Sequence, residues 1–297
     1  MSDSVASLRK KIANAGELQS VVRTMKALAA SSIGQYEASV LALADYARAL
    51  EMCLSVCFRE IRPTPAASGP FRKSDSSDLT AVVFGSDQGL VGQFNEAIAD
   101  HAITALKDLP GKPQVWAVGE RVRWLLADAK LDVKGLFAVP TSVQSITQLV
   151  GEIQLAVEAR GAATPNARVY VFHNQPKAGA LYEPIGERLL PLDDKWRAEL
   201  VKIDWPTGNL PELLCPSAAT LGAFISGHLF IAVFKACAES LASENASRLA
   251  AMQRAEKNID ELLESLQGKF HSLRQSGIDE ELFDVVSGFE ALSGTRN

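Results

Sequence analysis

The stretch that decides the fold is LRKKIANAGELQSVVRTMKALAASS, residues 8–32. Apolar and small residues repeat here every seven positions, and the line continues further: Leu8, Ala15, Val22, Ala29, Tyr36, Leu43 and Leu50. A second line rotates slowly beside it: Ile12, Leu18, Met25, Ile33, Val40, Ala47 and Leu54. This pattern is typical of a coiled-coil seam, and a helix of about 50 residues would be ~75 Å long. We expect a long helix over residues 1–60.

The C-terminal part carries a matching stripe. Met252, Ile259, Leu266 and Leu273 repeat every seven residues, and the phase changes near Gly277. Apolar residues then continue at spacings of three and four: Ile278, Leu282, Val285, Phe289 and Leu292. We assign residues 209–297 to a C-terminal helix that pairs antiparallel with the first one, because pairing buries both stripes. The alanines of SENASRLAAMQRAEKN, residues 243–258, permit close approach of the partner helix.

The middle of the chain has a different pattern. The apolar runs DLTAVVFGSD (78–87), PQVWAVGE (113–120) and ARVYVFHN (167–174) are typical of buried strands. Helical patterns lie around residues 95–109, 121–129 and 142–160. Alternating strands and helices predict an α/β fold with a mostly parallel, covered sheet. We expect a Rossmann-like domain over residues 78–208, inserted between the terminal helices, with a linker at 61–77 that is rich in Pro, Ser and Gly.

Composition excludes several classes of protein. A hydrophobic content of 47% and a charged content of 22% are those of a soluble globular protein, and the net charge of −5 gives no support for nucleic-acid binding. The cysteines at 53, 57, 215 and 237 lack the density of a disulfide framework, which favours a reducing compartment. We expect Cys53 and Cys57 to pack in the core rather than to bind metal.

Two segments bear on location. The N-terminus MSDSVASLRKKIANAG has charges where a signal peptide needs an apolar run, so we expect a cytoplasmic protein. The apolar stretch TLGAFISGHLFIAVF, residues 220–234, is shorter than the ~20 residues that cross a bilayer. We favour a buried helix there over a membrane span.

The motif GSDQGLVGQFN, residues 85–95, follows the first strand and opens a helix, which is where a glycine loop can bind phosphate. Its glycines at 85, 89 and 92 match neither the dinucleotide motif nor the P-loop, and no lysine follows them. We favour a structural turn over a nucleotide site.

Other chemistry-bearing residues form no recognisable catalytic pattern. The histidines at 101, 173, 228 and 271 are scattered, without an H-x-x-x-H pair or a nucleophile arrangement, so solvated or packed roles are favoured. The acidic group at residues 279–281 is typical of a solvated helix face. The sequence predicts no catalytic, cofactor-binding or metal-binding residues.

Three blocks resemble the γ subunit of F-type ATP synthases, and they occur in the family order. SLASENASRLAAMQRAEKNIDELLESL with LRQSGIDEELFDVVSGFEAL resembles its C-terminal helix, LRKKIANAGELQSVVRTMKALAASS its N-terminal helix, and GSDQGLVGQFN its central motif. The resemblance covers nearly the whole chain. It implies an antiparallel coiled coil, with a Rossmann-like domain that requires no nucleotide.

The resemblance implies a rotary function. The shaft would turn inside a hexamer of α and β subunits and couple ion flow through the membrane sector to ATP synthesis or hydrolysis. Its lower part would bind ε and the c-ring, at the cytoplasmic face of the membrane. Neither a cofactor nor a membrane span is implied. The residues implied to contact partners are Arg23, Met25, Lys26, Asp204, Trp205, Pro206, Arg248, Arg274 and Gln275.

Some segments depart from the family pattern. SSIGQYEAS at 31–39 replaces a basic continuation, and AFISGHLF at 223–230 replaces a polar segment. The central motif has Gln88, Val91 and Gln93 in place of the common residues, and Asp279 stands where threonine is frequent. These differences indicate a divergent branch, such as an alternative F-type ATPase.

Two other functions remain open at the level of sequence. A nucleotide- or phosphate-binding enzyme would explain the middle domain, but it leaves the two long seams without a role. A coiled-coil adaptor outside any ATPase would explain the seams, but not the ordered motifs.

Overall fold

The computed structural model describes residues 4–60, 78–163, 168–178, 180–209, 212 and 217–293. The linker expected at 61–77 lies outside the described residues. The helices are α1 (Val5–Ala42), α2 (Ala44–Glu60), α3 (Phe94–Lys107), α4 (Glu120–Asp128), α5 (Val143–Ala163), α6 (Asp194–Leu200) and α7 (Ser217–Ser293). The strands are β1 (Asp78–Phe84), β2 (Lys112–Val118), β3 (Asp132–Phe137), β4 (Arg168–Lys177) and β5 (Ala180–Leu190).

The chain forms two compact units. One, the two-helix unit, contains residues 1–28 and 249–297, and the other, the α/β unit, contains residues 29–248. Each long helix therefore contributes residues to both units.

The α/β unit is built on a five-stranded sheet in the order β3-β2-β1-β4-β5. Strands β1 to β4 pair in parallel, and β5 pairs antiparallel with β4 at the edge. The chain moves outward through β1, β2 and β3 and then returns to the other side of β1, as in doubly wound folds. The predicted α/β class with a mostly parallel sheet is confirmed.

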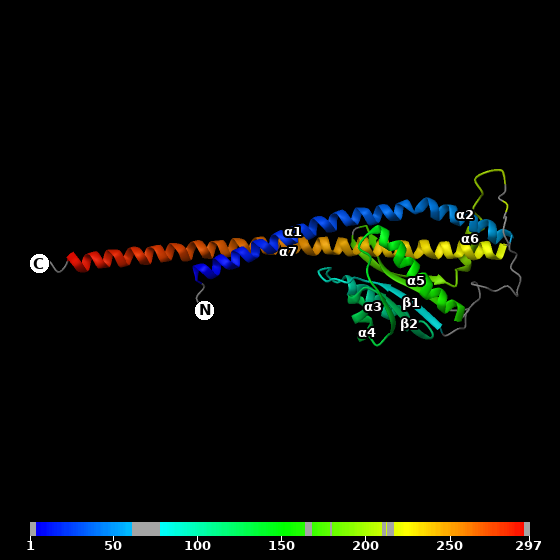
Figure 1. Cartoon of the computed structure of the whole chain (residues 1–297), viewed down its shortest axis with the longest axis horizontal. Coiled ribbons are helices and arrows are strands. Elements are labelled where there is room, and N and C mark those ends of the chain that lie inside the picture. Colours follow the sequence, from blue (N-terminus) through cyan, green and yellow to red (C-terminus); the bar gives the residue numbers. More distant parts are fainter. Residues whose placement is uncertain are drawn as a thin grey trace. The chain divides into compact units, whose positions relative to one another are not determined.

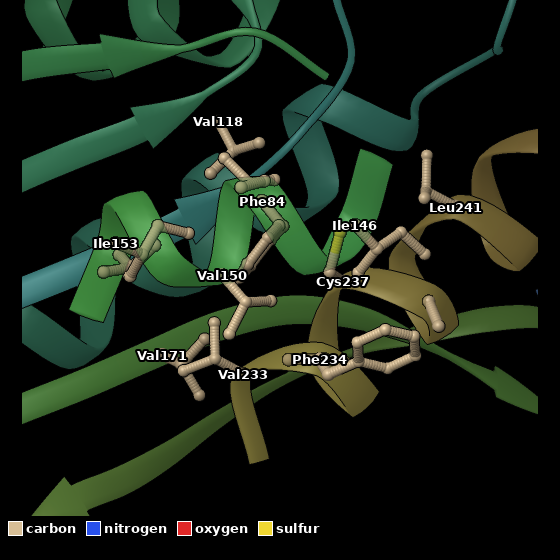
Figure 2. Close-up of a cluster of buried hydrophobic side chains, with 14 of the residues drawn as sticks. Phe84, Val118, Ile146, Val150, Ile153, Val171, Val233, Phe234, Cys237 and Leu241 are labelled. Atoms are coloured by element: carbon tan, nitrogen blue, oxygen red, sulfur yellow. The ribbon is translucent and has the colours of Figure 1, made fainter. Parts of the chain in front are cut away.

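Two layers of helix cover the sheet (Figure 1). Helices α3 and α4 pack on one face, against alternate strand residues such as Ala81, Val83 and Val115. Helix α5 and the first part of α7 pack on the other face, against Val82, Phe84 and Val171. Figure 2 shows this second core, where Ile146, Val150 and Ile153 of α5 meet Val233, Phe234, Cys237 and Leu241 of α7. The period of two along β1 thus separates the two cores.

In the two-helix unit, the first of the two predicted lines of α1 is the seam. Leu8 and Ala15 are 1% and 4% exposed, and on α7 Met252 and Leu266 are 2% and 8% exposed. The second line is wrong at Leu18, whose side chain is 58% exposed. The neighbouring Gln19 takes that place, because Ile12, Gln19 and Lys26 keep the strict seven-residue spacing.

The apolar stretch at residues 220–234 is helical, as expected, but it is only partly buried. Ile225 and Ile231 pack with Leu50 and Leu54 of α2 and Leu200 of α6, whereas the nearby positions 222 and 223 are exposed. By length and composition, α7 is the one described helix that qualifies as a candidate membrane span: its most apolar 18-residue window has a mean hydropathy of 1.7 and is 33% buried. Core helices of soluble proteins pass the same test.

Candidate functional site

Doubly wound folds bind ligands at the carboxyl edge of their parallel strands. In this chain, side chains of its own loops form hydrogen bonds at that edge. The Asp87 carboxylate accepts hydrogen bonds from the backbone N–H groups of Glu120, at 3.0 Å, and Val139, at 2.9 Å. Glu120 begins α4, so Asp87 sits where a helix N-terminus would hold an anion.

The polar groups of the turn after β1 also form hydrogen bonds with a side chain of the chain itself. Asn95 Oδ1 accepts a hydrogen bond from the Ser86 backbone N–H at 2.9 Å, and Asn95 Nδ2 donates to Ser86 Oγ at 2.8 Å. Gly85 packs so tightly that a Cβ would lie 2.4 Å from the Cβ of Val122. These contacts support the structural interpretation of the motif at 85–95, because Asn95 occupies the Ser86 N–H and the surroundings of Gly85 leave no space for a side chain.

A cavity of about 230 Å³ lies beside this turn, between the loops after β1 and β3 and helices α1 and α7. On its α7 side, Arg248 Nη2 donates to Glu244 Oε1 at 2.5 Å, and Nη1 donates to Asn245 Oδ1 at 3.2 Å. Burial raises the pKa of Glu244, the negative charge of Asp87 raises it further, and Arg248 opposes both effects. The guanidinium is therefore held against its own helix, and its side chain is 14% exposed.

A buried polar pair joins the sheet to α7. His173 Nε2, on β4, lies 2.8 Å from Glu239 Oε2, and Gln175 Nε2 lies 3.3 Å from Glu239 Oε1. Burial raises the pKa of Glu239, but the hydrogen bond from His173 and the charge of Lys235 outweigh it, so the pKa is lowered overall. His173 is thus packed rather than solvated, with 1% of its surface exposed.

The predicted contact residues of α1 meet α7 within the two-helix unit. Arg23 Nε lies 2.9 Å from Glu256 Oε1, and Lys26 Nζ lies 2.5 Å from Glu256 Oε2. Met25, between them, is half-buried. The role of Glu256 was not anticipated from the sequence, because the seven-residue repeat does not give the register in which two antiparallel helices meet.

The remaining predicted contact residues lie in two other places. Arg274 and Gln275 are exposed on α7, beyond the last half-buried seam residue, Leu273. Asp204 and Pro206 are exposed in the loop after α6, and the half-buried Trp205 donates its Nε1–H to Thr207 Oγ1 at 3.1 Å. The predicted residues thus belong to both units: Arg23, Met25, Lys26, Arg274 and Gln275 to the two-helix unit, and Asp204, Trp205, Pro206 and Arg248 to the α/β unit.

The described residues contain no group of three or more His, Cys, Asp or Glu side chains that could hold a metal ion. Cys57 is buried and Cys53 half-buried, both as free thiols, and burial raises the pKa of Cys57. The candidate residues described above thus form helix packing contacts, internal hydrogen bonds and surface ion pairs.

The model of the family described as ATP synthase matches residues 4–292. The chain belongs to the ATP synthase family. The ATP synthase gamma chain of Anaeromyxobacter dehalogenans (strain 2CP-1 / ATCC BAA-258) is 27% identical over 97% of this chain and 99% of its own length. The gamma chain of Geobacter metallireducens (strain ATCC 53774 / DSM 7210 / GS-15) is 28% identical over 98% of this chain and 99% of its own length. The resemblance to the γ subunit is therefore confirmed.

Solved structures of ATP synthases share the fold. A chain of the Euglena gracilis mitochondrial ATP synthase, from a structure of OSCP, F1 and the c-ring, matches with a TM-score of 0.61 at 16% identity, over 99% of this chain and 96% of that one. A chain from the central stalk and c-ring of the Tetrahymena thermophila mitochondrial ATP synthase matches with a TM-score of 0.57 at 19% identity, over 79% of this chain and 99% of that one. The chain therefore shares its fold with these chains.

Proposed function

We propose that this member of the ATP synthase family is the central rotor shaft of an F-type ATP synthase. It couples ion flow through the membrane sector to ATP synthesis or hydrolysis in a hexamer of three α and three β subunits. The observation that carries the proposal is the continuous helix α7, which runs from the α/β unit through the two-helix unit and continues for 20 residues beyond Leu273. Two long helices of this kind can transmit torque, because pairing along a seam resists bending and twisting.

The C-terminal end of α7 has an exposed apolar surface, which indicates that a partner encloses it. After Leu273 its apolar side chains are exposed in the described residues: Ile278 54%, Leu282 62%, Phe283 72%, Val285 70% and Val286 47%. An apolar patch that the chain leaves uncovered marks an interaction surface. We assign this surface, together with Arg248, Arg274 and Gln275, to the α and β subunits. We assign Arg23, Met25 and Lys26 to the N-terminal coupling segment.

We assign the loop after α6 to the foot of the rotor. It contains Asp204, Trp205 and Pro206, and it precedes α7 in the chain. We propose that this loop contacts ε or the c-ring, as part of an assembly on the cytoplasmic face of the membrane. In this arrangement the apolar first part of α7 does not cross the membrane, since it packs on α2 and α6.

We further propose that the subunit is non-catalytic and holds no cofactor. At the carboxyl edge of the sheet, Asn95 engages the backbone N–H of Ser86, and Asp87 engages those of Glu120 and Val139. A shaft acts instead by its orientation: an asymmetric surface contacts each β subunit differently, and rotation exchanges those states.

Co-expression of the chain with the α and β subunits of its own organism tests this proposal. We expect one stable complex that hydrolyses ATP, whereas the chain purified alone shows no turnover. A chain that fails to join α and β, or that hydrolyses ATP when free of them, would refute the proposal.

A further inference from the structure

One carboxylate in the two-helix unit binds two cations. Glu256 Oε1 accepts a hydrogen bond from Arg23 Nε at 2.9 Å, and Oε2 accepts one from Lys26 Nζ at 2.5 Å. Both cations come from α1 and the carboxylate from α7, so the cluster connects the two helices. Hydrogen bonds from Lys26 and Arg23 lower the pKa of Glu256, which keeps the carboxylate ionised.

The geometry gives the three groups unequal access to other molecules. The Glu256 side chain is 17% exposed, whereas those of Arg23 and Lys26 are 58% and 36% exposed. The cations thus cover the carboxylate and face outward themselves. Ion pairs with this much solvent contact contribute little to fold stability, so the cluster is a poor candidate for holding the helices together.

The sequence position of the cluster connects it with rotation. Arg23 and Lys26 flank Met25, in the segment that we assign to coupling contacts. A cation on a turning shaft would pair with any carboxylate of the surrounding subunits that comes within reach, and each such pair must break before rotation continues. Close charge pairs at some protein interfaces have measured coupling energies that are large enough to slow the step that breaks them.

We propose that Glu256 is a positioning residue that holds the cations of Arg23 and Lys26 on the shaft and so weakens their ion pairs with the surrounding subunits, which would otherwise stall rotation. This inference rests on the proposed rotor function. It gives Glu256 a kinetic role, in which the residue sets the barrier to rotation and leaves the fold unchanged.

The test compares Glu256→Gln in two backgrounds, using the assembled complex with α and β and its rate of ATP hydrolysis. In the otherwise native chain, at about 0.05 M salt, we expect E256Q to slow turnover about threefold. This is the effect expected when one modest ion pair must break before the shaft can rotate. In an R23Q/K26Q background the same change should alter turnover by less than about 1.5-fold, because the cations that Glu256 controls are gone.

Three controls separate charge from structure. Glu261→Gln removes an equal charge from the same helix. Glu261 pairs with Lys257 only at 3.8 Å, and the two side chains are 64% and 79% exposed, so this loose pair already leaves Lys257 free and its loss should leave turnover unchanged. Glu256→Asp keeps the carboxylate and should rescue most of the rate. Raising the salt concentration to about 0.5 M should also rescue E256Q, because screening weakens the released cations.

The outcomes are distinct. Equal slowing by E256Q in both backgrounds, equal slowing by E261Q, or no effect of E256Q would overturn the proposal. A large drop in the unfolding temperature of the E256Q chain would show a packing role and would overturn it as well. If the native chain fails to assemble with α and β, the rotor function itself fails, and that failure is visible before any variant is made.

Discussion

At the scale of single residues, the turns at the carboxyl edge of the sheet are fixed by close backbone contacts. Gly119 has a φ of +107°, and a Cβ added there would lie 2.7 Å from the carbonyl carbon and oxygen of Ser86. The same Ser86 oxygen accepts a hydrogen bond from the Arg121 N–H at 3.0 Å. The loop after β1 therefore leaves no space for a side chain at position 119.

We predict that Gly119→Ala lowers the free energy of unfolding of the α/β unit by about 2 to 4 kcal/mol, since it combines a disfavoured φ with a backbone clash. Gly151→Ala, in the interior of α5, is the matched control. A Cβ at position 151 meets no atom within 4 Å, so this change should stabilise the protein by up to about 1 kcal/mol. Urea unfolding of the full chain measures both, and equal effects of the two variants would contradict the prediction.

At the scale of elements, the pair of His173 and Glu239 connects β4 to α7 across a buried interface. The folded-state pKa of Glu239 is lowered, so the ionised carboxylate contributes stability above the ordinary pKa of 4.5. That contribution is lost as the pH falls through the lower folded-state pKa, because the carboxyl group then becomes protonated in both states.

We therefore predict that Glu239→Gln is most destabilising near neutral pH, and that its difference from the native chain shrinks as the pH falls below 4.5. The other carboxylates are the same in both proteins, so their contributions to the pH dependence of stability cancel in this difference. Glu183→Gln, which removes an exposed partner of Lys177, serves as the control and should change stability little at any pH. A Glu239→Gln effect that stays constant from pH 7 to acid would show that the charge of the carboxylate does not matter.

The seam of the two-helix unit gives a second prediction at this scale. Leu266 is 8% exposed and Leu262, one turn earlier on α7, is 50% exposed. Leu266→Ala should cost about 2 to 3 kcal/mol because it leaves a cavity in the seam, whereas Leu262→Ala should cost less than about 1 kcal/mol. Thermal unfolding of the full chain, followed by circular dichroism, compares them. Equal costs would mean that the seam has been placed on the wrong face of α7.

Sequence patterns predicted the elements that carry a strong apolar period and missed those that do not. The runs for β1, β2 and β4 were found, whereas β3 and β5 were not. Gly135 in β3 lies beneath the Trp116 ring and Gly186 in β5 beneath the Phe172 ring, so close that a Cβ would fall within about 2.5 Å of ring atoms. Glycine at these positions weakens the strand pattern, and only the packing of the neighbouring aromatic ring explains it.

The contacts of the candidate partner-binding residues are likewise not predictable from sequence patterns. Arg23 and Lys26 were selected by resemblance, but their shared partner Glu256 is 233 and 230 residues away in the sequence. The predicted seam position at Leu18 is wrong, because the strict seven-residue spacing from Ile12 places Gln19 there. The hydrogen bond from Gln19 Nε2 to Asp260 Oδ1 shows that this seam accepts polar pairs. Long-range pairing of this kind depends on helix register, which a single sequence does not supply.

At the scale of the whole molecule, the exposed end of α7 should act in assembly and coupling rather than in folding. Changing both Arg274 and Gln275 to alanine removes exposed polar groups, so we expect the unfolding temperature of the isolated chain to stay the same. Interface hydrogen bonds lost in the complex can cost about 1 to 3 kcal/mol, so assembly or ATP-driven ion pumping should weaken. Unchanged assembly and pumping would reject this contact assignment, and a large loss of monomer stability would indicate packing instead.

The most direct test of the central claim is to watch the chain turn. The α and β subunits are fixed to a surface, and a light-scattering bead is attached to the chain through Asp204→Cys, in the exposed loop after α6, with the native cysteines replaced. We predict that added ATP drives the bead around continuously in one direction and that removal of ATP stops it. A bead that stays still while the same complexes hydrolyse ATP would contradict the claim that this chain is the rotor shaft.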